Sequence, residues 1–130
     1  MVYLPKEYRH LFPEAKAPKW HKYGAKGVVI DGIKFPSIAE GRRYQELKLQ
    51  QHAGIISELE LQPEFVLQEK FKHQGKDHLA IKYRADFRYI HQGECIVEDV
   101  KGMLTAVYKI KKKMLLKRYP DINFKEIFAK

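Results

Sequence analysis

The sequence contains a single cysteine, Cys95, so no disulfide within the chain can stabilise the fold. One cysteine in an apolar stretch is typical of a buried small hydrophobe in a reducing compartment, and we predict a cytoplasmic protein. No apolar run approaches the ~20 residues that a membrane-spanning helix needs. The opening segment, MVYLPKEYRHLF, lacks the apolar core of a signal peptide, so we expect neither secretion nor a membrane partner.

Acidic residues are in the minority, with 16 Asp and Glu against 25 Lys and Arg, which gives a formal net charge of +9. The stretch from Lys101 to Pro120 contains seven basic residues and no acidic residue. Positive charge concentrated in this way favours a polyanionic partner, nucleic acid before a membrane surface. The alternative is charge that serves only solubility.

Proline is frequent in the first 24 residues, where Pro5, Pro13 and Pro18 exclude a long helix. We predict that residues 1–24 form an irregular basic arm and that residues 25–130 form one folded domain. The arm is rich in large apolar side chains, which must pack either on the domain's own sheet or on a second subunit.

The order of turn residues and apolar periods predicts an α/β domain with a central mixed β-sheet flanked by helices. Asp31-Gly32 and Gln92-Gly93 mark two-residue hairpin turns, and Ser37 marks a helix start. The expected elements are a hairpin over 28–35, a helix over 37–54, an extended segment over 56–68 bent at Pro63, a polar loop over 70–78, a hairpin of 79–91 with 94–102, a helix over 104–118 and a strand over 122–128.

The second predicted helix, residues 104–118, combines an apolar stripe with a lysine-rich face. Val107, Ile110 and Met114 follow the i, i+3, i+7 spacing of a stripe that faces a core. The opposite face is predicted to contact nucleic-acid phosphates through Lys109, Lys112, Lys113 and Lys117. Lysines bind backbone phosphates without reading bases, so they specify no sequence. A merely solvated face is the alternative.

The most informative stretch is RADFRYIHQGECIVEDVKG, residues 84–102, an apolar hairpin that carries Asp86, Glu98, Asp99 and Lys101. Side chains alternate between the two faces of a strand, so Asp99 and Lys101 share one face while Glu98 lies on the other. Pairing of the two strands brings Asp86 near Asp99. Two adjacent carboxylates repel each other unless a cation lies between them.

A magnesium ion suits such a pair, because it takes oxygen ligands and keeps water molecules for the substrate. We predict that Asp86 and Asp99 bind Mg²⁺ or Mn²⁺, with the Val100 carbonyl as a further ligand. Lys101 would orient or deprotonate the attacking water, or offset charge on a phosphoryl oxygen. These are the groups that phosphodiester hydrolysis needs. The alternative is a solvated sheet edge where the acids pair with nearby Lys and Arg.

The pattern Asp86…Asp99-Val100-Lys101 resembles the signature of the PD-(D/E)xK nuclease superfamily, with Ala85 where a proline often stands. About residues 22–113 also resemble a family of small phage and prophage proteins from this superfamily, long labelled as of unknown function. The similar blocks are KYGAKGVVIDGIKFPSIAEGRRYQELK, GIISELELQPEFVL, IKYRADFRYI and IVEDVKGMLTAVYKIKKK. The resemblance implies a restriction-endonuclease-like core that depends on Mg²⁺, with a catalytic Glu often supplied by the first helix. In this sequence that position is Glu40.

Two residues that the resemblance points to have alternative explanations. Glu40 belongs to Ser37-x-x-Glu40, a capping box in which the Glu reaches back to the N-cap amide, so it is either a metal-site residue or a cap. Gln62 is either a neighbour of the active site that contacts nucleic acid or a strand-end amide that binds backbone.

We therefore expect residues 25–130 to be a nuclease domain: a phage-encoded, metal-dependent DNA endonuclease in the cytoplasm of a bacterial host. We predict that it cuts branched or structured DNA, as a Holliday-junction resolvase does. Paired cuts need two symmetric sites, so we also predict a homodimer. The alternatives are a non-catalytic DNA-binding module of a phage replication or packaging complex, and a nuclease that acts on RNA.

Overall fold

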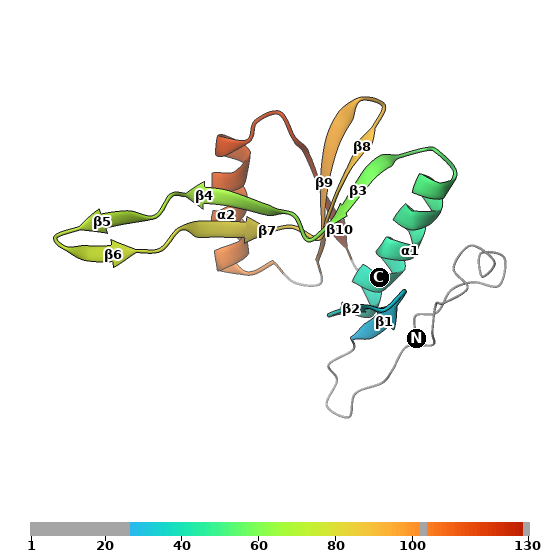
Figure 1. The fold of residues 1–130 in the computed structure, drawn as a ribbon, viewed down its shortest axis with the longest axis horizontal. Helices are drawn as coiled ribbons and strands as arrows, with labels where there is room; N and C mark the ends of the chain where they lie inside the picture. The colour runs from blue at the N-terminus through green and yellow to red at the C-terminus, as the bar shows by residue number, and fades with distance from the viewer. Residues whose placement is uncertain (1–26, 102–103, 129–130) are drawn as a thin grey trace. The chain divides into compact units, whose positions relative to one another are not determined.

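The computed structural model describes residues 27–101 and 104–128, in a chain that divides into two compact units (Figure 1). Of the described residues, 27–57 belong to the first unit, and 58–101 and 104–128 belong to the second. The predicted arm, residues 1–24, lies outside the described residues, and the domain boundary at residue 25 stays a prediction.

The described part of the first unit opens with a hairpin of β1 (Val28–Ile30) and β2 (Ile33–Phe35). Asp31 and Gly32 join the two strands with φ angles of 53° and 77°. Positive φ at both central residues is the mark of a type I′ turn, whose twist matches that of the strands. The predicted hairpin over 28–35 is confirmed.

Helix α1 (Ile38–His52) follows the hairpin, and Ser37 is its N-cap. The Ser37 hydroxyl accepts a hydrogen bond from the Glu40 amide at 3.1 Å, which satisfies one of the amides left open at a helix start. After the C-cap residue Ala53, Gly54 takes a left-handed φ of 78° and ends the helical path. The predicted helix over 37–54 is confirmed.

The contact between α1 and the hairpin depends on Gly41. A Cβ at this position would lie 2.5 Å from Val28 Cγ2, so only glycine permits so close an approach. One turn later, the Tyr44 ring lies 4.9 Å from the Phe35 ring, and its hydroxyl donates to Asp31 Oδ2 at 2.8 Å. These contacts join the helix to both the strand and the turn of the hairpin.

The second unit contains a four-stranded mixed sheet in the order β10-β9-β8-β3. Its strands are β3 (Ser57–Leu61), β8 (Phe87–His91), β9 (Glu94–Lys101) and β10 (Asn123–Phe128). β8 and β9 are antiparallel around Gln92-Gly93, whereas β10 runs parallel to β9 after a helical crossover. The predicted α/β class with a central mixed sheet and helices is therefore confirmed.

Two segments that we expected to be continuous are each broken into two strands. Residues 56–68 form β3 and β4 (Glu64–Gln68), and residues 79–91 form β7 (Ile81–Arg84) and β8. β4 and β7 leave the main sheet and pair with each other. The cause is Gln62-Pro63: Gln62 has a φ of 52°, and Pro63 has no amide to continue a ladder.

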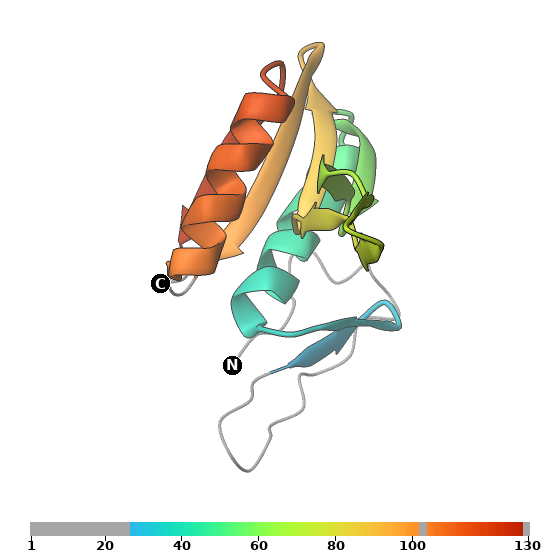
Figure 2. The ribbon, with the colours of Figure 1, turned by 90° about the vertical axis from the view of Figure 1, so that its left-hand side faces the viewer.

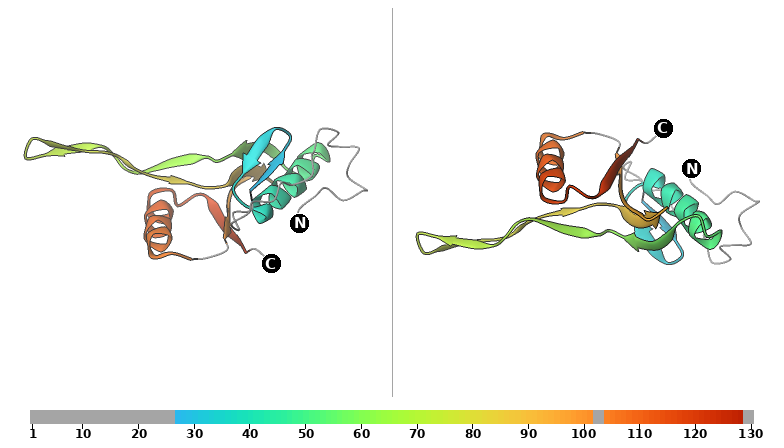
Figure 3. Two further views of the ribbon diagram at one scale, coloured as in Figure 1. Left: turned by 90° about the horizontal axis from the view of Figure 1, so that it is seen from below. Right: turned by 90° about the horizontal axis from the view of Figure 1, so that it is seen from above.

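The residues 70–78 were expected to be a polar loop, and that prediction is wrong. They contain a hairpin of β5 (Phe71–His73) and β6 (Lys76–His78), which continues outward from the β4–β7 pair (Figures 1 and 3). Gln74 and Gly75 have φ angles of 49° and 77°, so this is another type I′ turn. Because all but one residue of the two strands is exposed, they lack the apolar alternation that marks a buried strand.

Helix α2 (Ala106–Arg118) begins at the N-cap Thr105 and lies beside β9 and β10 (Figure 2). The predicted helix over 104–118 is confirmed, but its predicted core face is wrong at Val107 and Ile110, since only Met114 of the three packs against the buried cluster. Val107 and Ile110 are 62% and 60% exposed, whereas Tyr108 and Leu115 are buried. Tyr108 and Leu115 form a second apolar stripe, one residue along from Val107 and Met114. The helix buries the stripe that contains the large aromatic ring of Tyr108.

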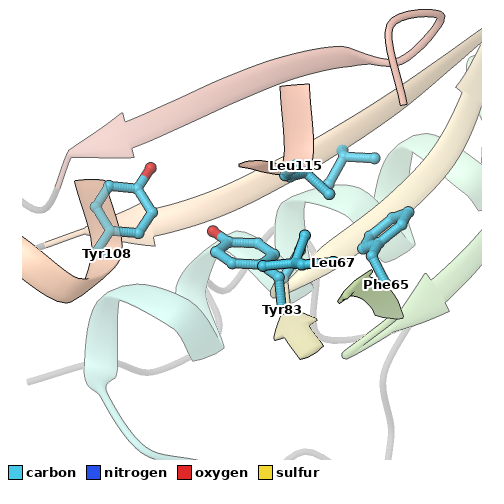
Figure 4. Packing of buried hydrophobic residues seen from close by; sticks show 7 residues of the cluster. Phe65, Leu67, Tyr83, Tyr108 and Leu115 are labelled. Carbon is cyan, nitrogen blue, oxygen red and sulfur yellow. The ribbon is translucent and has the colours of Figure 1, made fainter. Parts of the chain in front are cut away.

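The core of the second unit lies between α2 and the strands. Side chains from β4 and β7 face Tyr108 and Leu115 of α2 (Figure 4). The buried cluster consists of Phe65, Leu67, Tyr83, Ala85, Val97, Tyr108 and Leu115. Val97 is the buried member from β9, and it shares a strand face with Asp99, so the core ends where the polar side chains of β9 begin.

Candidate functional site

Asp86 stands immediately before β8, where the chain returns from β7 to the main sheet. Its amide donates to the Glu98 carbonyl at 3.1 Å, and its Oδ2 accepts from the Val100 amide at 2.7 Å. These two bonds lie on either side of Asp99 along β9. The predicted proximity of Asp86 and Asp99 through strand pairing is therefore confirmed.

The break that creates this position is itself hydrogen-bonded. The Gln62 amide donates to the Asp86 carbonyl at 2.9 Å, and the Ala85 amide donates to the Pro63 carbonyl at 3.1 Å. The two chain breaks thus lie side by side and satisfy each other's backbone groups. Gln62 contacts Asp86 through its main chain, while its side chain is exposed; a role in nucleic-acid binding stays a prediction.

Asp99 is a buried carboxylate, with 3% of its surface exposed. Oδ2 accepts a hydrogen bond from the Tyr83 hydroxyl, and Oδ1 lies 3.3 Å from Lys101 Nζ. Burial raises the pKa of Asp99 to about 6, against the lowering effect of Lys101, and the negative Glu126 adds to the rise. The ion pair confirms that Asp99 and Lys101 share one face of β9.

Lys101 lies between Asp99 and helix α2. Its ammonium nitrogen is 3.9 Å from the centre of the Tyr108 ring, a cation–π distance, and about a fifth of its side chain is exposed. The Tyr108 hydroxyl donates to Glu126 Oε2 at 2.7 Å. Burial raises the pKa of Tyr108 well above its usual range, and the bonds from Tyr108 and Lys112 lower the pKa of Glu126.

The Val100 carbonyl is placed on the Asp86 side of β9. The amide and carbonyl of one strand residue point toward the same neighbouring strand, and the Val100 amide points to Asp86. Asp86, Asp99 and this carbonyl therefore offer three oxygen-bearing groups at the start of β8. Within residues 27–101 and 104–128, no three His, Cys, Asp or Glu side chains are grouped in a way that could hold a metal ion, at this position or at any other.

Glu98 is fully buried on the opposite face of β9, where its carboxylate accepts from the Tyr89 hydroxyl. Its position agrees with the predicted alternation of the strand. Glu98 therefore belongs to a different environment from Asp99, although the two residues are adjacent in the chain.

Glu40 lies in the first unit, on the first turn of α1, and is 5% exposed. Half of the predicted capping box is present, because Ser37 Oγ accepts from the Glu40 amide. The assignment of Glu40 to a metal site stays a prediction.

The predicted phosphate-binding lysines differ from one another. Lys109, Lys113 and Lys117 are exposed, whereas Lys112 is half-buried and forms an ion pair with Glu126 at 3.0 Å. Lys112 is also 5.6 Å from the centre of the Phe124 ring, so it serves the packing of α2 against β10. Contacts of the other three lysines with phosphates stay a prediction.

Three neighbours of the site were not predicted from the sequence: Tyr83, Tyr108 and Glu126. Each reaches Asp99 or Lys101, directly or through one side chain, from a different element. Their only signal in the sequence is indirect. Tyr83 lies two residues before Ala85 on one strand face, and Tyr108 lies seven residues before Leu115 on the buried side of α2.

Residues 20–129 match the model of a family described as a protein of unknown function, DUF1064. The chain belongs to the DUF1064 family. No curated protein and no solved structure matches this DUF1064 chain. In the described part of the chain, no helix is long and apolar enough to span a membrane. The description of DUF1064 names no activity, so the resemblance to PD-(D/E)xK nucleases stays a prediction.

Proposed function

We propose that this DUF1064 protein is a metal-dependent nuclease that hydrolyses DNA phosphodiester bonds. The observation that supports the proposal is the grouping of Asp86, Asp99 and Lys101 where β8 begins and β9 ends, with the Val100 amide bound to Asp86. Carboxylates beside a lysine, in a chain of net charge +9, suit a negatively charged phosphodiester substrate.

The residues fit Mg²⁺ or Mn²⁺ by the chemistry of their donors. Asp86, Asp99 and the Val100 carbonyl would hold the ion through oxygen atoms alone, and a magnesium site commonly uses one or two carboxylates. When bound, the ion stabilises the negative charge that develops on the phosphoryl oxygens. Glu40 is proposed as a further ligand, on the strength of the resemblance alone.

Lys101 is proposed to orient the attacking water. Its ammonium group lies between the Asp99 carboxylate and the Tyr108 ring, so both its position and its direction are restrained. In the reaction, the water oxygen forms a bond to phosphorus and releases a proton to solvent, while the bond from phosphorus to the leaving sugar oxygen breaks and that oxygen takes up a proton from solvent. Lys101 Nζ donates a hydrogen bond to the water or to a phosphoryl oxygen while this occurs.

We further propose branched DNA as the substrate, a homodimer as the active form and the cytoplasm of a bacterial phage host as the compartment. A single site cuts one strand at a time, so paired cuts at a junction require two sites related by symmetry. These three proposals rest on the requirements of the chemistry and on the resemblance to phage proteins.

The test is incubation of the protein with labelled linear, nicked, flapped and four-way DNA, with and without Mg²⁺. We expect Mg²⁺-dependent cleavage, fastest on the four-way junction, with RNA of matched sequence cut more slowly. The matched control for the Asp99→Asn variant is Asp77→Asn, on the exposed β5–β6 hairpin, which should cut normally. Binding of DNA without any cleavage would contradict the proposal and favour a non-catalytic module.

A further inference from the structure

An open cleft of about 450 Å³ lies in the second unit, between the start of α2 and strands β4 and β7. Four of its lining residues are basic, namely Lys82, Arg84, Lys101 and Lys111. Among the described residues, Glu64 is its one acidic lining residue. None of these four residues belongs to the lysine face that the sequence predicted, and Lys82 and Arg84 belong to β7.

The positive charges of the cleft are only partly neutralised. Glu64 lies 3.1 Å from Arg84 and 3.9 Å from Lys82, so one carboxylate serves two cations. Lys111 Nζ donates to the Lys82 carbonyl at 3.2 Å, which is a neutral acceptor. Among the described residues, no carboxylate lies within ion-pair distance of Lys111. The cleft therefore holds a net positive charge, which favours an anionic ligand.

The first turn of α2 adds to the positive electrostatic potential of the cleft. Thr105, the N-cap, and Tyr108 line the cleft, and no acidic residue lies in that first turn. Thr105 Oγ1 accepts from the Tyr108 amide at 3.1 Å, but no carboxylate of this turn offsets the partial positive charge of the helix N-terminus. Together with the side-chain cations, it makes a site for a phosphate group.

The cleft adjoins the candidate catalytic residues. Lys101 belongs to both sites, and Tyr83, which lines the cleft, donates its hydroxyl hydrogen to Asp99. A strand with one phosphate in the cleft would thus have a neighbouring phosphate close to Asp99.

We propose that this cleft binds one backbone phosphate of a nucleic acid strand, next to the phosphate that is cut, and that Lys111 and Arg84 are its principal ligands. The part of the proposal that concerns cutting rests on the proposed nuclease function. A contact to a backbone phosphate carries no sequence information, so we expect binding in the cleft to be independent of base sequence.

The test measures binding of fluorescein-labelled duplex DNA by fluorescence anisotropy in EDTA, where no cleavage occurs, over a series of salt concentrations. The variants are Lys111→Gln, Arg84→Gln and Glu64→Gln. The charge-matched control is Lys125→Gln: Lys125 is exposed on β10, opposite Glu98 in the register, and so lies on the other face of the sheet. Circular dichroism confirms that each variant is folded.

Loss of one phosphate contact should reduce the slope of log K against log salt by about 0.9. We expect this change, with a several-fold loss of affinity, for Lys111→Gln and Arg84→Gln, and a smaller loss for Lys125→Gln. Glu64→Gln should tighten binding, since it removes the only carboxylate among the described residues that line the cleft. If the role of Glu64 is only structural, Glu64→Gln should instead weaken DNA binding.

Equal losses of DNA affinity in Lys111→Gln and Lys125→Gln would contradict the proposed phosphate site in the cleft, because they would show only a general effect of net charge. The two proposals fail separately. If the variants show the expected binding pattern but the wild type never cuts DNA with Mg²⁺, the proposed phosphate site stands and the proposed nuclease activity is contradicted. If the wild type cuts DNA but Lys111→Gln and Lys125→Gln lose the same DNA affinity, the proposed nuclease activity stands and the proposed phosphate site is contradicted.

Discussion

The Val100 amide donates a hydrogen bond to Asp86 Oδ2 at 2.7 Å, although Asp86 lies outside strand β8. A side-chain oxygen thereby replaces the backbone carbonyl that the next pair of the ladder would supply. This bond fixes Asp86 relative to Asp99 without any cation. The carboxylates are thus preorganised by the protein itself.

Preorganisation predicts a measurable stabilisation by metal. Mg²⁺ or Mn²⁺ that binds only the folded chain contributes about 2.7 kcal/mol at roughly 100 times its dissociation constant, which should raise the melting temperature by several degrees. Asp99→Asn should abolish this rise, and Asp77→Asn should keep it. An equal response of both variants, measured by thermal unfolding, would remove Asp99 from the metal site.

The pH dependence of stability follows from the raised pKa of Asp99. The folded chain holds the Asp99 proton more tightly than the unfolded chain does, because the pKa rises from 3.8 to about 6. This contribution to stability is complete below the unfolded pKa and is lost as the pH rises through about 6. In metal-free buffer, the wild type should therefore lose stability relative to Asp99→Asn between these values. A difference in melting temperature between wild type and Asp99→Asn that stays constant over this pH range would contradict the raised pKa of Asp99.

The two roles of Glu40 can be separated by two variants. Ser37→Ala removes the acceptor of the Glu40 amide and should cost about 1 kcal/mol of stability, with cleavage retained at temperatures where the chain is folded. Glu40→Gln keeps a hydrogen-bonding side chain but removes a ligand charge, so it should strongly reduce cleavage at nearly normal stability. Normal cleavage by Glu40→Gln would leave Glu40 as a cap only.

Tyr108 is predicted to position Lys101 through its ring and not through its hydroxyl. Tyr108→Phe loses the bond to Glu126 but keeps the ring, so its kcat should remain near the wild-type value. Tyr108→Leu removes the ring face from Lys101 and should lower kcat with little change in KM. Equal kcat values for the two variants, both folded by thermal unfolding, would remove this role.

Local patterns predicted much of the fold. Asp31-Gly32, Ser37 and Gln92-Gly93 each act through neighbouring backbone, so the first hairpin, α1 and the β8–β9 turn follow from short stretches of sequence. The alternation within β9 likewise predicted that Asp99 and Lys101 share a face. Such features need no knowledge of distant residues.

The remaining features depend on contacts between distant segments. The buried face of α2 is chosen by Tyr83, Phe124 and Glu126, which meet Tyr108 or Leu115 only after folding. The β5–β6 hairpin is exposed and polar, so its strands carry no apolar period. The cationic cleft combines residues of β7 with residues of α2, and these two elements are too far apart in the sequence for a local pattern to predict that they meet.

The most direct test of the central claim is the single-turnover rate of cleavage of a four-way DNA junction in Mg²⁺, for the wild type, Asp86→Asn, Asp99→Asn and Lys101→Ala. Loss of a group that acts in the transition state costs about a hundredfold or more in rate. We predict a loss of at least this size in each variant, with Asp77→Asn unaffected. DNA binding should be retained in Asp86→Asn and Asp99→Asn, whereas Lys101→Ala should also weaken binding because Lys101 lines the cationic cleft. Cleavage at the wild-type rate by Asp99→Asn, or by Lys101→Ala, would contradict the account.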